Sequence, residues 1–231
     1  MTFRTRIKMC GLTREADVDA AVHAGADAIG FVLYPPSPRF VNLRRAAELA
    51  QRLPAFVTPV LLLVNASAAE VAQAVAAVPN GLLQFHGDES PADCQTAGRP
   101  YLKAARIPPG AAGSGFDLLK YAQDHAAAQA VLLDAHVEGF GGGGQSFDWT
   151  AFNWSHPLLN ASSRLVLSGG LTPANVTDGI HRVRPWAVDV SSGIEAHSPD
   201  GQALKGVKDP SRMSAFVAAV RAADASPLRP A

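Results

Sequence analysis

Cysteine is scarce in this chain, since its 231 residues include only two, Cys10 and Cys94. Two cysteines do not make the disulfide framework of a small secreted scaffold, so we expect reduced thiols, as in the cytoplasm. An excess of charge is also absent, because 20 Lys and Arg residues balance 20 Asp and Glu residues. Such a balance forms no broad basic face, so nucleic acid is not an expected partner.

Long apolar runs are missing as well. The best of them, PAFVTPVLLLV at 54–64, is shorter than the roughly 20 residues that a membrane-spanning helix needs. The N-terminal sequence MTFRTRIKMC has no apolar signal-peptide segment. We therefore expect a soluble, cytoplasmic protein with no membrane partner. Hydrophobic residues make up 48% of the chain, which is enough for an ample core.

The chain does have a regular alternation of short apolar runs with alanine-rich amphipathic segments. The apolar runs predict eight strands, at residues 6–10, 28–33, 56–64, 82–86, 101–107, 130–135, 164–170 and 187–192. A helical pattern follows each strand. The residues predicted to cap four of these helices are Thr13, Asn42, Ser67 and Thr172.

Eight strand–helix repeats in about 225 residues are typical of a (β/α)₈ TIM barrel, whose usual size is about 250 residues. We expect a single α/β domain over residues 1–231, with its core at about 6–222 and a frayed tail at 223–231. A doubly wound open sheet is the alternative, because it also alternates strands and helices. The strand count and the lack of a linker favour the barrel.

In such a barrel the carboxyl ends of all strands meet at one rim, where the active site lies. The polar residues predicted at this rim are Cys10, Arg39, His86, Asp134, Ser168, Asp189, Ser191 and Ser192. Cys10 and Asp134 come from the first and sixth strands, so they can face each other across the mouth. A thiol and a carboxyl placed in this way suit a general base and a general acid. The alternative for Cys10 is a buried, inert packing residue.

Glycines follow the last two predicted strands. Gly169 and Gly170 come after the seventh strand, and Ser192 and Gly193 come after the eighth. The loops after these two strands are the usual phosphate site of the fold, and glycine lets backbone N–H groups approach an anion closely. Tight turns without a ligand are the alternative. The glycine run Gly141, Gly142, Gly143 and Gly144 follows Asp134 and predicts a lid that closes over the ligand, or else an inessential surface loop.

Six segments of the chain resemble those of the phosphoribosylanthranilate isomerase family, in the same order and over about residues 6–221. They read KMCGLT, GFVLYPPSPRFV, LLQFHGDE, LLDAHVEGFGGGGQSFDW, LSGGLTPANV and DVSSGIE with GVKD. The resemblance implies an enzyme of tryptophan biosynthesis that needs no metal or organic cofactor. Its reaction is an Amadori rearrangement, from N-(5-phosphoribosyl)anthranilate to 1-(2-carboxyphenylamino)-1-deoxyribulose 5-phosphate.

Carried over by position, the resemblance makes Cys10 the general base and Asp134 the general acid. It implies that Arg39 holds the anthranilate part of the substrate. The phosphate clamp would consist of Gly169 and Gly170 on one side and Ser192 and Gly193 on the other. The substrate implied by the resemblance is a small phosphorylated aminosugar, and we expect the protein to be a monomer or a homodimer.

These roles require a raised pKa for Asp134 and a thiol that is ionised with help from a positive charge. Lys8 lies two residues before Cys10 on the same face of the strand and can supply that charge, with Asp189 as its expected partner. We expect His86 and Asp189 to contact substrate, although His86 can instead bond only to a loop. His86, Asp134 and His136 could suggest a metal site, but their spacing matches no local metal-ligand motif, so no metal is expected.

Other enzymes of phosphorylated sugars remain as alternatives. A metal-dependent epimerase would be sensitive to a chelator. An indole-glycerol-phosphate synthase needs a catalytic Lys and Glu at strand ends, and no Glu is evident there. Lys103 could form a Schiff base, although a packed stem inside the barrel is the simpler interpretation. A phosphometabolite-binding protein without activity is the third alternative.

Overall fold

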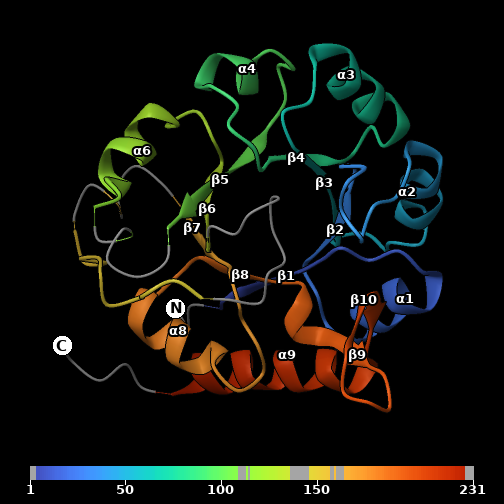
Figure 1. Cartoon of the computed structure of the whole chain (residues 1–231), viewed down its shortest axis with the longest axis vertical. Coiled ribbons are helices and arrows are strands. Elements are labelled where there is room, and N and C mark those ends of the chain that lie inside the picture. Colours follow the sequence, from blue (N-terminus) through green and yellow to red (C-terminus); the bar gives the residue numbers. More distant parts are fainter. Residues whose placement is uncertain are drawn as a thin grey trace.

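The computed structural model describes residues 4–108, 113, 115–135, 146–156, 159 and 164–226. Eight parallel strands close into a barrel in the order β1 to β8, with β8 paired to β1 (Figure 1). Helices surround this ring, as Figure 1 shows. The (β/α)₈ TIM barrel predicted from the alternation is therefore confirmed, and the open sheet is excluded.

The barrel strands follow the predicted apolar runs closely. They are β1 Arg6–Cys10, β2 Ala28–Val32, β3 Thr58–Leu63, β4 Leu82–Phe85, β5 Tyr101–Ile107, β6 Ala130–Ala135, β7 Leu165–Leu167 and β8 Ala187–Val190. The ends differ by a few residues, because several polar or glycine residues at the predicted carboxyl ends belong to the rim loops. Ser168 and Ser191, for example, lie just beyond β7 and β8.

Most of the described helices also match the amphipathic segments. They are α1 Glu15–Ala24, α2 Leu43–Ala50, α3 Ala68–Ala77, α4 Pro91–Gln95, α6 Leu118–Asp124, α8 Val176–Val183 and α9 Pro210–Ala225. The side chains of Asn42 and Ser67 accept hydrogen bonds from the first turns of α2 and α3, as predicted. The caps predicted at Thr13 and Thr172 are wrong, because Arg14 and Asn175 occupy those positions. Helix α9 continues to Ala225, into the segment expected to fray.

Side chains alternate between the two faces of each barrel strand. Outward-facing residues such as Met9, Phe31 and Leu133 pack with the helices in the main hydrophobic core. Inward-facing residues such as Leu132 and Val166 form a second, smaller cluster inside the barrel. The inward positions nearest the carboxyl ends carry most of the polar side chains.

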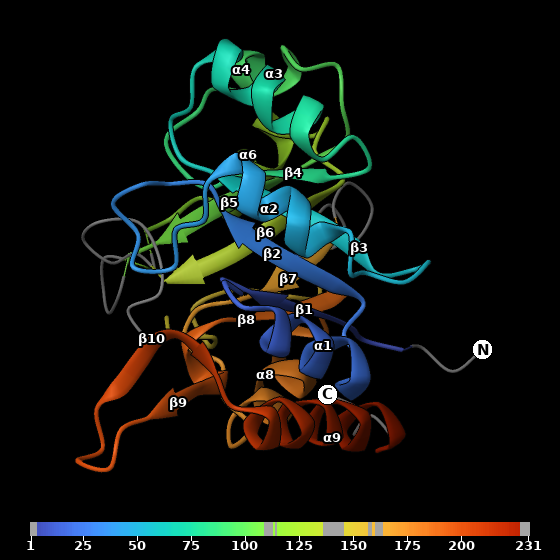
Figure 2. The same cartoon turned by 90° about the vertical axis from the view of Figure 1, so that its right-hand side faces the viewer.

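A two-stranded hairpin lies between β8 and α9, where the sequence predicted only a loop. After the short 3₁₀ helix η1 (Ser192–Ile194), strand β9 (Glu195–His197) pairs antiparallel with β10 (Ala203–Lys208). Figure 2 shows this hairpin on the side toward which the arrowheads of β5 and β6 point, which is the rim of the barrel. The hairpin thus adds residues to the rim that the eight-unit pattern does not supply.

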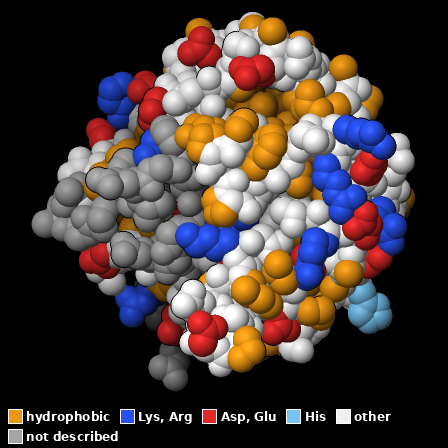
Figure 3. All heavy atoms as spheres, turned by 45° about the vertical axis from the view of Figure 1, so that its right-hand side comes forward, with side chains coloured by type: hydrophobic (Ala, Val, Ile, Leu, Met, Phe, Trp, Pro, Cys, Tyr) orange, Lys and Arg blue, Asp and Glu red, His pale blue; other side chains and the backbone are white. Residues whose placement is uncertain are grey.

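The surface over α1 and α2 is covered by both signs of charge. Figure 3 shows acidic and basic side chains side by side on this face. Exposed ion pairs such as Arg44–Glu48 and Arg52–Asp19 account for this mixture. Exposed pairs of this kind contribute little to stability, because water screens their attraction. Within the described residues, no helix has both the length and the apolar character that crossing a membrane requires.

Candidate active site

Cys10 ends β1 with its side chain inside the barrel, in a small cluster with Val32, Leu62 and Val64. It is 4% exposed. Gly30 on the neighbouring strand leaves room for the sulfur, since a Cβ atom there would lie 2.6 Å from Cys10 Sγ and 3.1 Å from Lys8 Nζ. The thiol therefore sits at the inner end of the rim, as the sequence predicted, rather than among the outer packing residues.

Lys8 lies on the same face of β1, as its spacing from Cys10 predicted. Its ammonium donates to Asp189 Oδ1 at 2.7 Å, and Ser168 Oγ donates to Asp189 Oδ2 at 3.1 Å. Burial would lower the pKa of Lys8, but Asp189 and Cys10 raise it above the ordinary value. Lys8 is therefore a permanent positive charge beneath the thiol. The structure places Asp189 as the partner of Lys8 and Ser168.

Burial raises the pKa of the Cys10 thiol above its ordinary value, while the charge of Lys8 and its hydrogen bond to the thiol lower it. The lowering by Lys8 agrees with the sequence-based hypothesis. The net direction is upward, because desolvation of the thiolate is the larger effect. Lys8 thus reduces the cost of ionising Cys10 without removing it.

Asp134 lies at the carboxyl end of β6 and is 7% exposed. Its Oδ2 is 3.0 Å from His86 Nε2, and His86 Nδ1 is 2.9 Å from Gln84 Nε2. Because the Gln84 amide donates to Nδ1, a neutral imidazole carries its proton on Nε2 and donates it to Asp134. His86 therefore bonds to a side chain of the site rather than only to a loop. Oδ1 of Asp134 has no hydrogen-bond partner among the described residues.

The two predicted halves of the phosphate clamp meet at the rim. Gly169 and Gly170 have φ angles of 79° and 63°, which glycine adopts without strain. A Cβ atom on Gly193 would lie 1.9 Å from the carbonyl oxygen of Leu171, so only glycine lets the loops after β7 and β8 approach so closely. Among the described residues, the N–H groups of Gly170 and Gly193 have no hydrogen-bond partner and can bind an anion.

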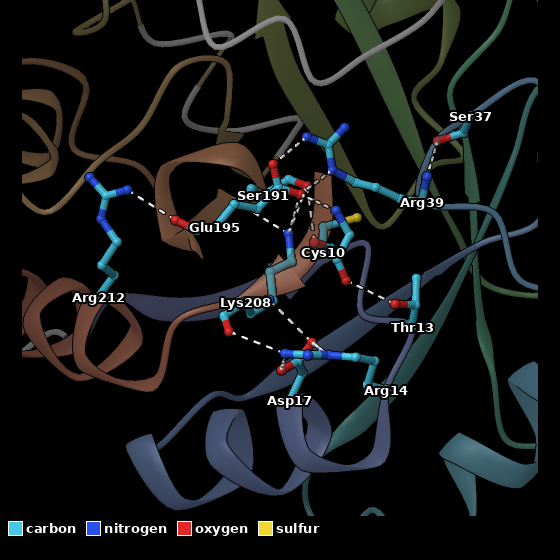
Figure 4. Close-up of polar contacts among 11 residues, drawn as sticks. Cys10, Thr13, Arg14, Asp17, Ser37, Arg39, Ser191, Glu195, Lys208 and Arg212 are labelled. Atoms are coloured by element: carbon cyan, nitrogen blue, oxygen red, sulfur yellow. Dashed lines mark hydrogen bonds and ion pairs between the residues drawn. The ribbon is translucent and has the colours of Figure 1, made fainter. Parts of the chain in front are cut away.

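Arg39 is brought to the same rim by the loop after β2, but its side chain is already engaged. Its guanidinium donates from Nε and Nη2 to the two carboxylate oxygens of Glu195, at 2.7 Å and 2.8 Å (Figure 4). The sequence-based reasoning assigned no role to Glu195, Lys208 or Gln84. The spacing of Gln84 from His86 was a usable signal, because residues two apart on a strand share a face. Glu195 and Lys208 had no such signal, since a hairpin brings them together.

The glycines Gly141, Gly142, Gly143 and Gly144 of the expected lid lie outside the described residues. Lys103 does not pack inside the barrel, because its ammonium bonds to Glu89 at 2.7 Å in the outer layer. No group of His, Cys, Asp and Glu side chains suited to a metal occurs in the described part of the chain.

The comparisons with known proteins agree with this geometry. A family model described as "N-(5'phosphoribosyl)anthranilate (PRA) isomerase" matches residues 7–219. An N-(5'-phosphoribosyl)anthranilate isomerase of Leptothrix cholodnii is 60% identical over 222 residues, which are 96% of this chain and 93% of that protein.

Two solved structures are similar over nearly their full length. One is a phosphoribosyl anthranilate isomerase in complex with reduced 1-(o-carboxyphenylamino)-1-deoxyribulose 5-phosphate. It is 31% identical with a TM-score of 0.73 and covers 94% of this chain and 99% of its own. The other shows generated monomers of the dimeric phosphoribosylanthranilate isomerase of Thermotoga maritima, and it is 30% identical with a TM-score of 0.74 and has the same coverage. The chain thus belongs to the N-(5'-phosphoribosyl)anthranilate isomerase family.

Proposed function

We propose that Cys10 and Asp134 are the general base and the general acid with which this chain isomerises N-(5'-phosphoribosyl)anthranilate in tryptophan biosynthesis. The observation that carries this assignment is the position of both side chains on the inner face of the barrel, at the carboxyl ends of β1 and β6. Each has its own polar partner, since Lys8 partly offsets the rise that burial causes in the pKa of Cys10, and His86 Nε2 lies 3.0 Å from Asp134 Oδ2.

The residue types suit the two proton transfers of an Amadori rearrangement. Asp134 donates a proton to the ring oxygen of the ribose as the C1–O bond breaks, and a Schiff base forms with the anthranilate nitrogen. That Schiff base acidifies the hydrogen on C2, which the Cys10 thiolate removes to give an enolamine. The enolamine then tautomerises to the ketone product. Both transfers take place in a buried site, where a correctly placed group competes with little water.

The rest of the rim would hold the two charged ends of the substrate. The free N–H groups of Gly170 and Gly193 support a phosphate site between the loops after β7 and β8. Arg39 would bind the carboxylate of the anthranilate ring with the donors that Glu195 leaves free. Asp189 and His86 would act through their contacts with Lys8 and Asp134. The expected lid at residues 141–144 stays a prediction.

Substrate deuterated at C2 separates the two proposed roles. Cys10→Ser should make removal of the C2 hydrogen the slow step, so the deuterium isotope effect on kcat should increase. Asp134→Asn should make ring opening the slow step, so the isotope effect should approach one. The loss of substrate fluorescence gives the rates, with the substrate prepared in situ from anthranilate.

The assignment would be contradicted if both variants gave the same isotope effect as the unmodified protein. Turnover of the unmodified protein with an unchanged rate in Cys10→Ser would return Cys10 to a packing role. An increased isotope effect in Asp134→Asn alone would exchange the two roles.

For the assembly, a monomer or a homodimer of one-domain chains remains the proposal. The dimeric Thermotoga maritima relative supports the homodimer. Sedimentation equilibrium of the full chain, whose mass is 24.1 kDa, distinguishes the two states directly.

A further inference from the structure

Glu195 is a buried charge that the proton transfers do not use. It is 0% exposed, and its carboxylate accepts four hydrogen bonds. Two come from Arg39, one comes from the backbone N–H of Gly206 at 2.8 Å, and one comes from the ammonium of Lys208 at 3.2 Å. An acceptor so fully occupied has no room to bind a ligand, so its role must lie in the donors it holds.

The pairing fixes the direction of the Arg39 guanidinium. Because Glu195 takes Nε and Nη2 in a bidentate contact, the planar group can neither rotate nor swing away. Nη1 has no partner in the part of the chain that is described, and Figure 4 shows one terminal nitrogen of Arg39 directed away from Glu195. One edge of the guanidinium is thus anchored, while the other is free for a second anion.

A bidentate pair of Arg39 with Glu195 alone would be electrically neutral and would attract a carboxylate only weakly. Lys208 changes that balance. It is 2% exposed, and it also donates to the carbonyl oxygen of Ser191 at 2.8 Å. Burial lowers the pKa of Lys208 to about 8, so at neutral pH the ammonium is mostly charged. Two cations and one anion then leave one net positive charge beside the free edge of Arg39.

We infer that Glu195 and Lys208 are positioning residues that aim Arg39 at the anthranilate carboxylate while keeping a net positive charge there. This inference rests on the proposed role of Arg39 in binding that carboxylate. Substrate binding would complete the cluster with a second anion. Two cations would then face two anions in a buried site, where charge-assisted hydrogen bonds are strong.

The hairpin explains how the cluster is built. Glu195 begins β9 and Lys208 ends β10, so the antiparallel pairing places the two side chains together. The hairpin is tied to the start of α1, because Thr13 Oγ1 donates to the carbonyl oxygen of Gly206 at 2.8 Å and Asp17 accepts from the N–H of Lys208 at 3.2 Å (Figure 4). A segment outside the eight strand–helix units thus supports a residue from the loop after β2.

The test compares two substrates that differ only in the carboxylate. One is phosphoribosylanthranilate, and the other is its analogue without the carboxyl group, prepared by condensing ribose 5-phosphate with aniline. The variants are Glu195→Gln, Lys208→Met and Arg39→Met, and product formation is followed by chromatography for both substrates. The ratio of the two KM values measures the carboxylate contact, whereas a general loss of structure changes both KM values together.

We expect Glu195→Gln and Lys208→Met each to raise KM for phosphoribosylanthranilate about tenfold, with little change in kcat, because a charge-assisted contact made in both the ground and transition states is weakened. KM for the aniline analogue should stay within about twofold. If either variant does not fold, the other still tests the cluster, and Glu195→Asp, which keeps the charge but shortens the reach, provides a third measurement.

The outcomes separate the inference from the proposed function. If Arg39→Met changes the KM ratio but Glu195→Gln and Lys208→Met do not, the positioning role is overturned and the carboxylate contact stands. If Arg39→Met leaves the ratio unchanged, the proposed contact of Arg39 fails. Equal increases of both KM values in Glu195→Gln would show a purely structural role.

Asp224→Asn is a matched control at the other end of the barrel. Asp224 is also a carboxylate in an ion pair, since it bonds to Arg221 at 3.0 Å and to the N–H of Thr5 at 3.1 Å. Its substitution should lower the melting temperature without a change in either KM.

Discussion

The two halves of the barrel interior are built by the same strands but hold very different side chains. Toward the amino ends, the interior is apolar, with Val60, Leu102 and Leu132 at 5% exposure or less. Toward the carboxyl ends, equally buried positions hold charged and polar groups. These are Lys8, Gln84, His86, Asp134 and Asp189.

The difference shows that the half of the interior that carries the candidate site contributes less to the stability of the fold. Buried apolar side chains stabilise the folded state in proportion to the area they remove from water. Buried ion pairs such as Lys8–Asp189 gain little, because desolvation offsets their attraction. The carboxyl half therefore contributes less to stability per residue. Substitutions in that half should mainly affect turnover, whereas those in the amino half should mainly affect stability.

The largest effect on kcat is expected from the two residues proposed to transfer protons. Cys10→Ser and Asp134→Asn should each lower kcat by about 10²- to 10⁴-fold, the usual contribution of a general acid or base. The melting temperature should change by only a few degrees, because both substitutions conserve volume. Steady-state kinetics at saturating substrate give kcat, and a thermal melt gives the melting temperature. A large loss of stability with little loss of kcat would remove the contrast between the halves.

The next largest effect on kcat is expected from Lys8, whose positive charge lies beneath the Cys10 thiol. Lys8 lowers the pKa of Cys10, so Lys8→Met should raise that pKa further and reduce the thiolate fraction at neutral pH. The proposed base acts as a thiolate, so kcat should rise as pH increases through this pKa, and the rise should move to higher pH in Lys8→Met. We expect a lower kcat at pH 7, because a smaller fraction of Cys10 is thiolate there, and a smaller loss at a pH above the raised pKa.

Titration of Cys10 by its ultraviolet thiolate absorbance checks the shift independently of turnover, with Cys94→Ala as the background to remove the second thiol. Lys8→Met also leaves Asp189 without its cation, so the double variant with Asp189→Asn is the control. An unchanged Cys10 pKa in both would refute the role of Lys8.

Gln84→Leu replaces a polar side chain with an apolar one, so the carboxyl half of the interior becomes more apolar, like the amino half. Gln84 Oε1 is buried and has no hydrogen-bond partner among the described residues, so the amide carries a desolvation cost of about 1–3 kcal/mol. Leu has no polar group to desolvate, so Gln84→Leu should raise the free energy of unfolding by part of that cost. It also removes the donor that fixes the His86 tautomer, so kcat should fall about fivefold, within the range of effects of general acid–base support. Urea unfolding should show the higher free energy of unfolding, and steady-state kinetics should show the lower kcat.

The smallest effect on turnover is expected from the amino half. Leu132 is 0% exposed within the inner cluster, and Leu132→Ala should lower the free energy of unfolding by about 2–5 kcal/mol. At a temperature where the variant is fully folded, kcat should stay within about twofold of the unmodified value. A tenfold loss of kcat in the folded variant would show that the two halves are coupled.

Local patterns in the sequence were sufficient to predict the barrel and the position of some of the residues at its rim. Apolar runs predicted all eight strands, and their spacing placed Cys10 and Asp134 on one rim. The predicted cap failed at Thr13 because its side chain bonds to Gly206 in the hairpin. At Thr172 the hydroxyl accepts from the backbone N–H of Ala174 and the Thr172 N–H donates to Asn175 Oδ1, but these bonds close a turn that precedes the helix, which begins at Val176. Capping propensity is a local signal, which a non-local bond or a preceding turn can override.

The sequence by itself determined the periodicity, and therefore the fold, and it determined that Cys10, Asp134 and the glycines after β7 and β8 lie at one rim. Tertiary structure alone decided which groups are partnered. Lys8 with Asp189, His86 with Asp134, and Arg39 with Glu195 are separated by 181, 48 and 156 residues. A closed ring of strands makes such pairs neighbours, and burial then fixes their charges. No local pattern carries that information, because it depends on which strands and hairpins meet in space.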